Sequence, residues 1–374
     1  MRLKKLVLSN FRSYENLTWN PGPGTNLLVG PNGAGKSNLA EAIYMLATTK
    51  SHRTSKDTEV IRIGSDWCRI VGDIEREKQN DVAVEIQLAK GEKTLKVNTV
   101  KQPKISEVIG QFNVVIFSTS DVEMVKGDPS GRRRFLNLEI CQTRPRYCYA
   151  LAKYKRILEQ RNSLLRECAE GKGDFAQLAA WDDQLIHSGA IVVEHRAEFC
   201  KGIDGLAREM YLKLSAGAEE LRISYDPSFQ VGETDDLEMI ERRFAESLSQ
   251  VRTQEISRGM TVRGPQRDDV SLSVGGMDLR YYGSRGQQRA AALAIKLAEV
   301  ELIKERTAEY PVLLLDDVAS ELDPDRRLRA LELVLGKCQA VLTTTTAADL
   351  PGLDKLECQI FEVAKGGIAA LGRG

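Results

Sequence analysis

The sequence predicts an α/β protein with a head, made of a mixed sheet and an antiparallel β lobe, and an inserted helical arm. A glycine-rich loop at 30–38 stands between a strand-like run and a helical pattern. A continuous apolar run that ends in two carboxylates follows at 311–317. Between the two, residues 130–257 are mainly helical in periodicity. We therefore expect 1–129 and 258–374 to form the head and 130–257 to form the arm.

The chain is balanced in charge. Its 374 residues include 53 Lys and Arg and 53 Asp and Glu, so the formal net charge is zero. A general attraction to nucleic acid is therefore absent, and DNA binding would need local basic patches. Seven cysteines occur without a C-x-x-C pair, which disfavours a zinc site or a disulfide framework. No run of about 18 apolar residues occurs, so we expect a cytoplasmic protein without a membrane partner.

The glycine-rich loop matches the phosphate-binding pattern G-x-x-x-x-G-K-[ST]. A strand-like run at 25–29 precedes it, and a helical pattern continues to about Thr48. Glycines let the backbone wrap round a phosphate, and the helix N-terminus directs free N–H groups at the anion. We expect Lys36 to contact the β- and γ-phosphates and the Ser37 hydroxyl to hold Mg²⁺. The candidate nucleotide-binding residues of this loop are Gly30, Pro31, Asn32, Gly33, Ala34, Gly35, Lys36, Ser37 and Asn38.

The rest of the first segment is predicted to be mainly strands. Residues 1–29 predict two strands before the loop strand, and alternation of period two within 58–98 predicts an antiparallel meander. A buried type of strand follows at 113–117. The polar loop 51–55 is close in sequence to the nucleotide site, and its Arg53 is expected either to contact the nucleotide or to be solvated.

A helical hairpin dominates the second segment. Asp128 as N-cap and Pro129 at the first helical position begin it. Apolar residues at steps of three and four continue to a break at 171–173 and resume beyond it. This pattern predicts two arms of about 40 residues each with an imperfect coiled-coil seam. A strand near 221–225 and a third helix near 236–257 follow.

The run at 311–317 is typical of a buried parallel strand whose C-terminal end meets a ligand. Together with the phosphate loop it predicts a Walker B strand. We expect Asp316 to bind Mg²⁺ directly or through water, and Asp317 to polarise the attacking water. Lys36, Asp316 and Asp317 are thus the candidate catalytic residues. A second anion site is expected at 284–289, where a hydroxyl and backbone amides precede an amphipathic helix.

These motifs resemble known families. Residues 284–287, Ser-Arg-Gly-Gln, resemble the signature of ABC-class ATPases, and 320–323 resemble the D-loop of that class. The whole set resembles the RecF family of recombination-repair ATPases, relatives of the SMC proteins, in the family's order along nearly the whole chain. The segments that support this resemblance are 10–12, 30–38, 51–54, 125–127, 131–136, 161–162, 264–269, 284–289 and 313–318.

Some positions depart from the pattern of these families. Gln266 stands where the RecF family usually has histidine, which puts a role for that side chain in doubt. The strand at 341–342 ends in threonines and lacks the switch histidine of ABC transporters, which favours slow hydrolysis. Gln111 lies near the expected Q-loop glutamine, whereas 117–118 resembles the family's segment better.

The resemblance implies an ATP-driven homodimer that binds double-stranded DNA at gaps and helps load recombinase with RecR- and RecO-type mediators. It implies a slow, DNA-dependent ATPase with Mg²⁺ that acts in repair, recombination, replication restart and the SOS response. In the ABC class the signature caps ATP held by the opposite subunit. Ser284, Gly286 and Gln287 are therefore expected to contact the ATP of a second copy.

Two alternatives remain open at this point. The nucleotide-binding subunit of a transporter is the second candidate function, although the long helical hairpin and the missing switch histidine disfavour it. Arg132, Arg133 and Arg134 are candidate DNA phosphate contacts. Their competing interpretation is a cluster at a helix start that pairs with the nearby acids Asp128 and Glu139.

Overall fold

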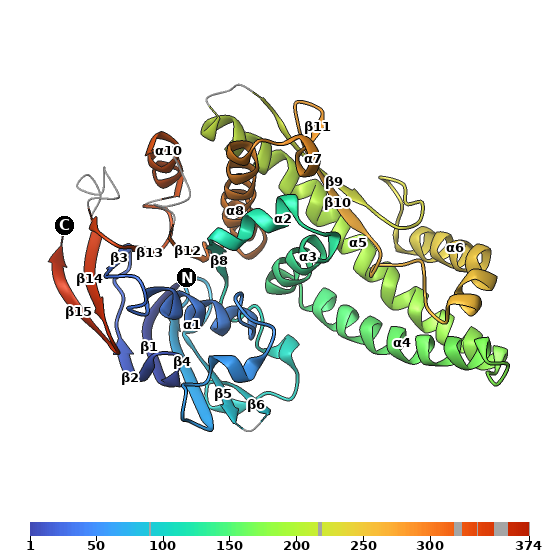
Figure 1. Ribbon diagram of the computed structural model, residues 1–374, viewed down its shortest axis with the longest axis horizontal. Helices are drawn as coiled ribbons and strands as arrows, with labels where there is room; N and C mark the ends of the chain where they lie inside the picture. Colours follow the sequence, from blue (N-terminus) through green and yellow to red (C-terminus); the bar gives the residue numbers. More distant parts are fainter. Residues whose placement is uncertain (90, 216–218, 318–323, 335, 348–357, 374) are drawn as a thin grey trace.

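The computed structural model describes residues 1–89, 91–215, 219–317, 324–334, 336–347 and 358–373. Within them the chain forms a head with two six-stranded sheets and a helical arm that extends to one side (Figure 1). A third sheet of three strands lies beside the arm. The α/β class with a mixed sheet, an antiparallel lobe and an inserted arm is confirmed.

The core sheet has the strand order β15-β14-β3-β13-β12-β8. All neighbours are parallel except β14 and β15. The strands predicted at 113–117 and 311–317 are therefore present, side by side, and buried. Their bounds, with those of the other core strands, are β3 Thr25–Val29, β8 Val114–Phe117, β12 Val312–Leu315, β13 Ala340–Thr344, β14 Cys358–Ala364 and β15 Gly367–Arg373.

The antiparallel lobe is the second six-stranded sheet, in the order β2-β1-β4-β5-β6-β7. Buried and less buried residues alternate along β5, as the period of two predicted. The strands are β1 Arg2–Phe11, β2 Tyr14–Trp19, β4 Trp67–Glu75, β5 Val82–Ala89, β6 Glu92–Val97 and β7 Val100–Lys101. The short 3₁₀ helices are η1 Asp57–Val60, η2 Ile105–Glu107 and η3 Thr119–Asp121.

The arm contains the predicted hairpin, but its first half is two helices. α3 spans Pro129–Thr143 and α4 spans Pro145–Ala169. Arg144 between them has φ −135° and ψ 87°, because the residue before a proline is disfavoured in the α region. The expectation of one arm of about 40 residues is therefore wrong for the first half. The second half, α5 at Phe175–Leu214, does span 40 residues.

The rest of the chain connects the arm to the head. β9 pairs with β10, which lies beyond α6 in sequence, and β10 pairs with β11. The predicted strand near 221–225 and the predicted helix near 236–257 are confirmed as β9 and α6. These elements and the remaining helices are α2 Val122–Lys126, β9 Leu221–Asp226, α6 Leu237–Arg258, β10 Asp269–Val274, β11 Met277–Asp278, α7 Leu279–Tyr282, α8 Arg285–Thr307 and α10 Pro324–Val334.

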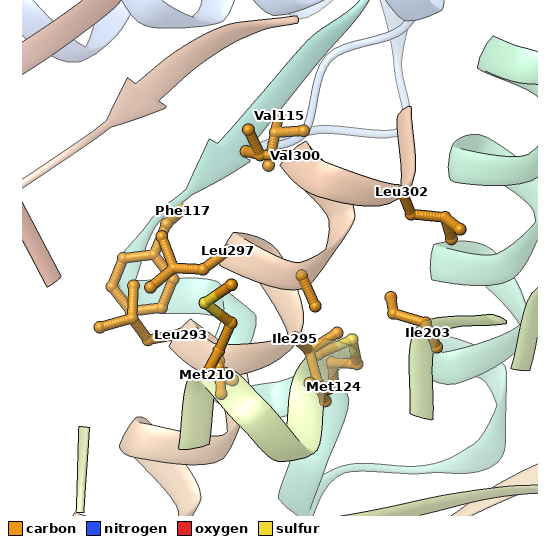
Figure 2. Packing of buried hydrophobic residues seen from close by; sticks show 14 of the residues in the cluster. Val115, Phe117, Met124, Ile203, Met210, Leu293, Ile295, Leu297, Val300 and Leu302 are labelled. Carbon is orange, nitrogen blue, oxygen red and sulfur yellow. The ribbon is translucent and has the colours of Figure 1, made fainter. Parts of the chain in front are cut away.

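The core sheet is covered on both faces. Alternate residues of its strands point to opposite sides, so Val114 packs with α1 and the antiparallel lobe, whereas Val115 packs with α8 and the arm. Figure 2 shows the second side, where Phe117 of β8 lies against Leu293 and Leu297 of α8. This two-sided burial explains why the strands are continuous apolar runs. The parallel pairing of β13 with β3 and with β12 places the carboxyl ends of these three strands at one edge of the sheet.

Candidate nucleotide site

The phosphate loop connects β3 to α1, which spans Lys36–Thr48 and ends at the predicted residue. Gly35 precedes α1 with φ 116°, a conformation that favours glycine. A Cβ at Gly35 would lie 2.6 Å from the Tyr14 hydroxyl, and a Cβ at Gly30 would collide with the Val363 carbonyl. The first turn of α1 has no side-chain cap and no acidic residue. Its free N–H groups therefore suit an anion.

Lys36 lies over the phosphate loop and contacts its backbone. Its Nζ donates to the carbonyl oxygens of Gly30 at 2.6 Å and Pro31 at 3.1 Å. Burial lowers the pKa of Lys36, and the nearby Asp317 and Asp316 oppose this shift. The ammonium thus lies close to the loop and to the carboxylates at once. Pro31, Asn32 and Gly33 at the crown of the loop are exposed.

Ser37 and Asp316 meet at the carboxyl edge of the core sheet, although they are 279 residues apart in the chain. The Ser37 hydroxyl donates to Asp316 Oδ1 at 2.9 Å, and the Thr343 hydroxyl donates to the same oxygen at 2.7 Å. A serine hydroxyl and an aspartate are oxygen ligands of the kind Mg²⁺ prefers, and Mg²⁺ keeps several waters. This pair therefore fits the metal. The described residues contain no cluster of three or more His, Cys, Asp or Glu suited to a metal.

Asp317 follows Asp316 at the end of β12 and is exposed. Its φ is 56°, in the left-handed region that is uncommon for a residue other than glycine. Its backbone N–H donates to Thr343 Oγ1 at 3.0 Å. Thr343 therefore holds both aspartates of the Walker B segment. The motif reading did not select Thr343, and its only sequence signal was its place at the end of a predicted strand.

Glu41 of α1 organises the outer wall of the site, and the sequence did not single it out. It is fully buried and accepts two hydrogen bonds from Arg12, at 2.9 and 2.6 Å. It also accepts from the Ser51 hydroxyl at 2.5 Å and from Arg53 at 3.3 Å. Burial alone would raise the pKa of Glu41, but these hydrogen bonds and the two arginines outweigh it, so the pKa is lowered.

This arrangement places Arg53 beside the loop. Its guanidinium donates to Asn38 Oδ1 at 2.8 Å, and Asn38 Nδ2 donates to the Ser13 hydroxyl at 3.0 Å. The turn between β1 and β2 is thereby tied to the first turn of α1. Next to it, the Tyr14 hydroxyl is buried and has no hydrogen-bond partner within the described residues. Burial raises the pKa of Tyr14. It is therefore a neutral donor beside Gly35, which suits a phosphate oxygen.

The second predicted anion site is at the N-terminus of α8. Ser284 Oγ accepts from the Gln287 N–H at 3.2 Å, and the Ser284 N–H donates to Gln287 Oε1 at 2.9 Å. This capping box fixes the start of the helix. Gln287 also donates to Glu219 at 2.7 Å, and Arg326 donates to the Gly286 carbonyl at 3.0 Å. Ser284 itself is exposed.

The two anion sites of one chain are separate. Figure 1 shows α7, which directly precedes Ser284, apart from α1. Among the described residues, the hydrogen bonds of 284–287 reach Glu219 and Arg326, and none of them joins the phosphate loop. The D-loop segment predicted at 320–323 lies outside the described residues.

The chain is similar in sequence to known proteins over nearly its whole length. A family model described as the RecF/RecN/SMC N terminal domain matches residues 2–364. A DNA replication and repair protein RecF from Bacillus cytotoxicus is 41% identical over 365 residues, which cover 98% of this chain and 96% of that protein. The chain belongs to the RecF family. A RecF from Geobacillus kaustophilus is 39% identical over 371 residues, covering 99% and 100% of the two chains.

Solved structures agree with this membership. A structure of the recombination mediator protein RecF with ATP in the RecFOR pathway matches this RecF family member with a TM-score of 0.91 at 33% identity, covering 99% and 97% of the chains. An Smc head bound to the C-winged helix domain of ScpA matches with a TM-score of 0.56 at 17% identity, which shows a common fold alone. The transporter-subunit alternative is therefore not favoured. No described helix is long and apolar enough to cross a membrane.

The three arginines predicted as DNA contacts in this RecF family member do not share one surface. Arg132 is buried, and its guanidinium donates to both carboxylate oxygens of Asp269, at 2.7 and 2.9 Å. Arg133 is half-buried and donates to a backbone carbonyl at 2.7 Å. Arg134 is exposed and donates to the Ser51 carbonyl at 2.9 Å. Arg132 is thus committed to an internal ion pair, with an acid other than the two expected from sequence.

The positions that departed from the family pattern also have partners. Gln266 Oε1 accepts from the Tyr154 hydroxyl of α4, and its Nε2 donates to the Arg263 carbonyl at 2.9 Å. Gln266 therefore connects α4 of the arm to the segment between α6 and β10. Gln111 donates to the Glu107 carbonyl at 3.4 Å, outside the core sheet. Phe117, in contrast, is the last residue of β8 and pairs with Leu315 of β12, and Ser118 follows it.

Proposed function

We propose that this chain is a RecF-type protein of recombinational DNA repair and replication restart, whose ATP-driven homodimer binds double-stranded DNA at gaps and helps load recombinase. Its relatives are named DNA replication and repair proteins, and the similar solved structure is a recombination mediator with ATP. RecR- and RecO-type mediators are the expected partners, because that structure is assigned to the RecFOR pathway.

One observation supports the nucleotide site most strongly. Ser37 and Asp316, from opposite ends of the chain, share a hydrogen bond of 2.9 Å beneath the loop that Lys36 spans. In this proposal Lys36 and the amides of 30–37 bind the phosphates of ATP. Ser37 and Asp316 hold Mg²⁺, which neutralises charge on the phosphates when bound. Asp317 orients and polarises the attacking water.

The dimer is proposed from the exposure of the second anion site. Ser284 at the N-terminus of α8 is exposed, and no hydrogen bond of the described residues joins this site to the phosphate loop of the same chain. In a two-fold dimer each signature reaches the loop of the other copy, which is a self-complementary arrangement. ATP then joins the two chains, and hydrolysis releases them.

The first test changes Ser284. A Ser284→Asp variant keeps a good N-cap but places a negative charge against the γ-phosphate, so ATP binding by the monomer persists while ATP-driven dimerisation is lost. Light scattering with ATP measures the dimer, and a fluorescent ATP analogue measures binding. Ser271→Asp, at an exposed serine of β10, is the matched control. A Ser284→Asp variant that dimerises like the parent protein would overturn the sandwich arrangement.

The second test changes Asp317. An Asp317→Asn variant is expected to bind ATP but to lose turnover by a factor of about 10² or more, because general-base or water-positioning groups contribute about 10²–10⁴. Phosphate release is the measurement, with and without duplex DNA. Glu238→Gln, at an exposed acid of α6, should leave turnover unchanged. Unchanged turnover in Asp317→Asn would remove Asp317 from the mechanism.

A further inference from the structure

The first half of α4 is unusually basic for a chain of zero net charge. Residues 140–158 contain no Asp or Glu. Over the same stretch they contain five cations. These are Arg144, Arg146, Lys153, Lys155 and Arg156. Because the whole chain is neutral, this local excess of positive charge marks one surface of the arm.

Several of these side chains lie on one face of the helix. Arg146, Tyr149, Lys153 and Arg156 are spaced at i, i+3, i+7 and i+10, which places them in a single stripe along α4. All four are exposed, whereas residues on the opposite face, such as Tyr154, are buried in the arm. We call these four residues the α4 stripe.

The cations of the α4 stripe have no acidic partner among the described residues. Arg146, Lys153 and Arg156 form no ion pair within the described part of the chain, whereas Arg144 at the start of the helix pairs with Glu198 at 2.5 Å. Several exposed cations elsewhere on the arm, in contrast, are paired. Lys172 lies 3.0 Å from Glu170, Lys213 lies 2.6 Å from Glu209, and Arg242 lies 3.9 Å from Glu246. The stripe is therefore free to bind an external anion.

The antiparallel lobe extends the same basic surface. Lys104, just before η2, places its Nζ 5.7 Å from the centroid of the Tyr149 ring. Tyr149 is 56% exposed, so this cation lies over a ring that remains open to solvent. On another flank, Lys50 after α1 lies near Lys155 and contributes, after burial, to lowering the pKa of Lys155. The surface thus crosses the junction between head and arm, where Figure 1 shows α4 beginning beside α3.

We propose that the α4 stripe, with Lys104, binds the phosphate backbone of duplex DNA. This inference rests on the proposed function and gives its DNA contact a location other than Arg132. From Arg146 to Arg156 the helix rises about 15 Å, which spans the axial length of about four base pairs. Regularly spaced, unpaired cations suit a phosphate backbone, whereas the buried centre of a protein–protein interface is usually poor in charged residues.

The experiment reverses the charge of the stripe in the full chain. A triple variant, Arg146→Glu with Lys153→Glu and Arg156→Glu, is compared with the parent protein by anisotropy of a labelled duplex, from about 50 to about 200 mM salt. We expect affinity to fall at least about tenfold and the slope of log K against log salt to lose about 2.7, since each phosphate contact contributes about 0.9. ATP binding and ATP-driven dimerisation should be unchanged.

The matched control carries the same change of charge at paired positions, Lys172→Glu with Lys213→Glu and Arg242→Glu. It should keep the salt slope of the parent protein. Equal slope losses in both variants, or none in the stripe variant, would overturn the assignment of DNA to the stripe while leaving the proposed function intact. A parent protein that fails to bind duplex with ATP would overturn the proposed function and the stripe together. A stripe variant that binds DNA normally but loses binding to an isolated acidic mediator would assign the stripe to protein.

Discussion

At the scale of single residues, Glu41 shows how a fully buried acid can hold together the segments around a site. It holds Arg12 from the turn between β1 and β2 and Ser51 from the loop after α1. The same carboxylate and Asn38 of α1 hold Arg53. The sequence had left open whether Arg53 contacts the nucleotide or is solvated. Glu41 therefore connects three segments around the nucleotide site.

A Glu41→Gln variant is expected to have a free energy of unfolding about 2 kcal/mol lower than the parent protein at neutral pH, because a buried arginine–carboxylate pair is broken. The pKa of Glu41 in the folded chain is below its ordinary value. Its contribution is therefore present at pH above about 5 and is lost as pH falls through about 4 and lower. Urea denaturation at several pH values is the measurement.

The control for this prediction is Glu15→Gln, since Glu15 of β2 is exposed and pairs with Arg62 at 3.1 Å. It should change stability little at any pH. If the difference between the parent protein and Glu41→Gln stayed constant down to pH of about 3, the ionised carboxylate would not be the source of the stability.

The residues that motifs specify could be predicted, and those that tertiary packing specifies could not. Lys36, Ser37 and Asp316 meet because the phosphate loop and the Walker B strand have local sequence patterns with a fixed geometry. Arg132 looked like a surface cation because nothing near it in sequence shows that Asp269 folds onto it. Thr343 and Glu41 were missed for the same reason. Their partners come from elsewhere in the chain.

At the scale of elements, α8 connects the exposed signature to the interior. Its N-terminus carries Ser284, and along its length Lys296 is buried between Glu139 of α3, at 3.1 Å, and Glu299, at 3.0 Å. Burial lowers the pKa of Lys296, but the two carboxyls outweigh it and hold the pKa well above its ordinary value. Burial, then Glu139, raises the pKa of Glu299. Lys296, Glu139 and Glu299 therefore form one buried group of interacting charges.

A double-mutant cycle tests this buried group. Lys296→Met alone leaves carboxyls without their cation and is expected to destabilise the protein by about 3 kcal/mol or more. The double variant, which also carries Glu299→Leu, should lose less unfolding free energy than the two single variants lose together. The difference, which is the coupling energy, should be at least about 1 kcal/mol. Chemical denaturation of the four proteins gives the coupling. Additive effects would show that Lys296 and Glu299 do not depend on each other.

Elements were predicted well where the pattern was long and periodic, and less well at their ends. The antiparallel meander, α1 and α6 agree with the expectation because each buries one regular face. The hairpin pattern continues through Arg144, since apolar spacing persists across it, and the break comes from Pro145 alone. The pairing of β9 with β10 could not be predicted from local patterns, because α6 separates the two strands in sequence.

At the scale of the whole molecule, the head is assembled from both ends of the chain. The amino group of Met1 donates to the Tyr310 carbonyl at 3.0 Å, and Gln339 accepts from the Leu3 N–H at 2.7 Å. The sequence predicted this discontinuity because the two nucleotide motifs lie on either side of a helical insertion. Which strands become neighbours was not predictable, because non-local pairing leaves no period in the sequence.

The position of β3 has a consequence for synthesis on the ribosome. β3 carries the phosphate loop, yet both of its neighbours, β13 and β14, are made last. At about 5–20 residues per second, the chain from Val29 to Ala340 takes on the order of 15–60 s to emerge. During this time β3, which is largely buried in the folded protein, has neither of its neighbouring strands to pair with. An unpaired strand of this kind favours aggregation. We expect nascent chains truncated before β13 to remain bound to chaperones and to be degraded rapidly.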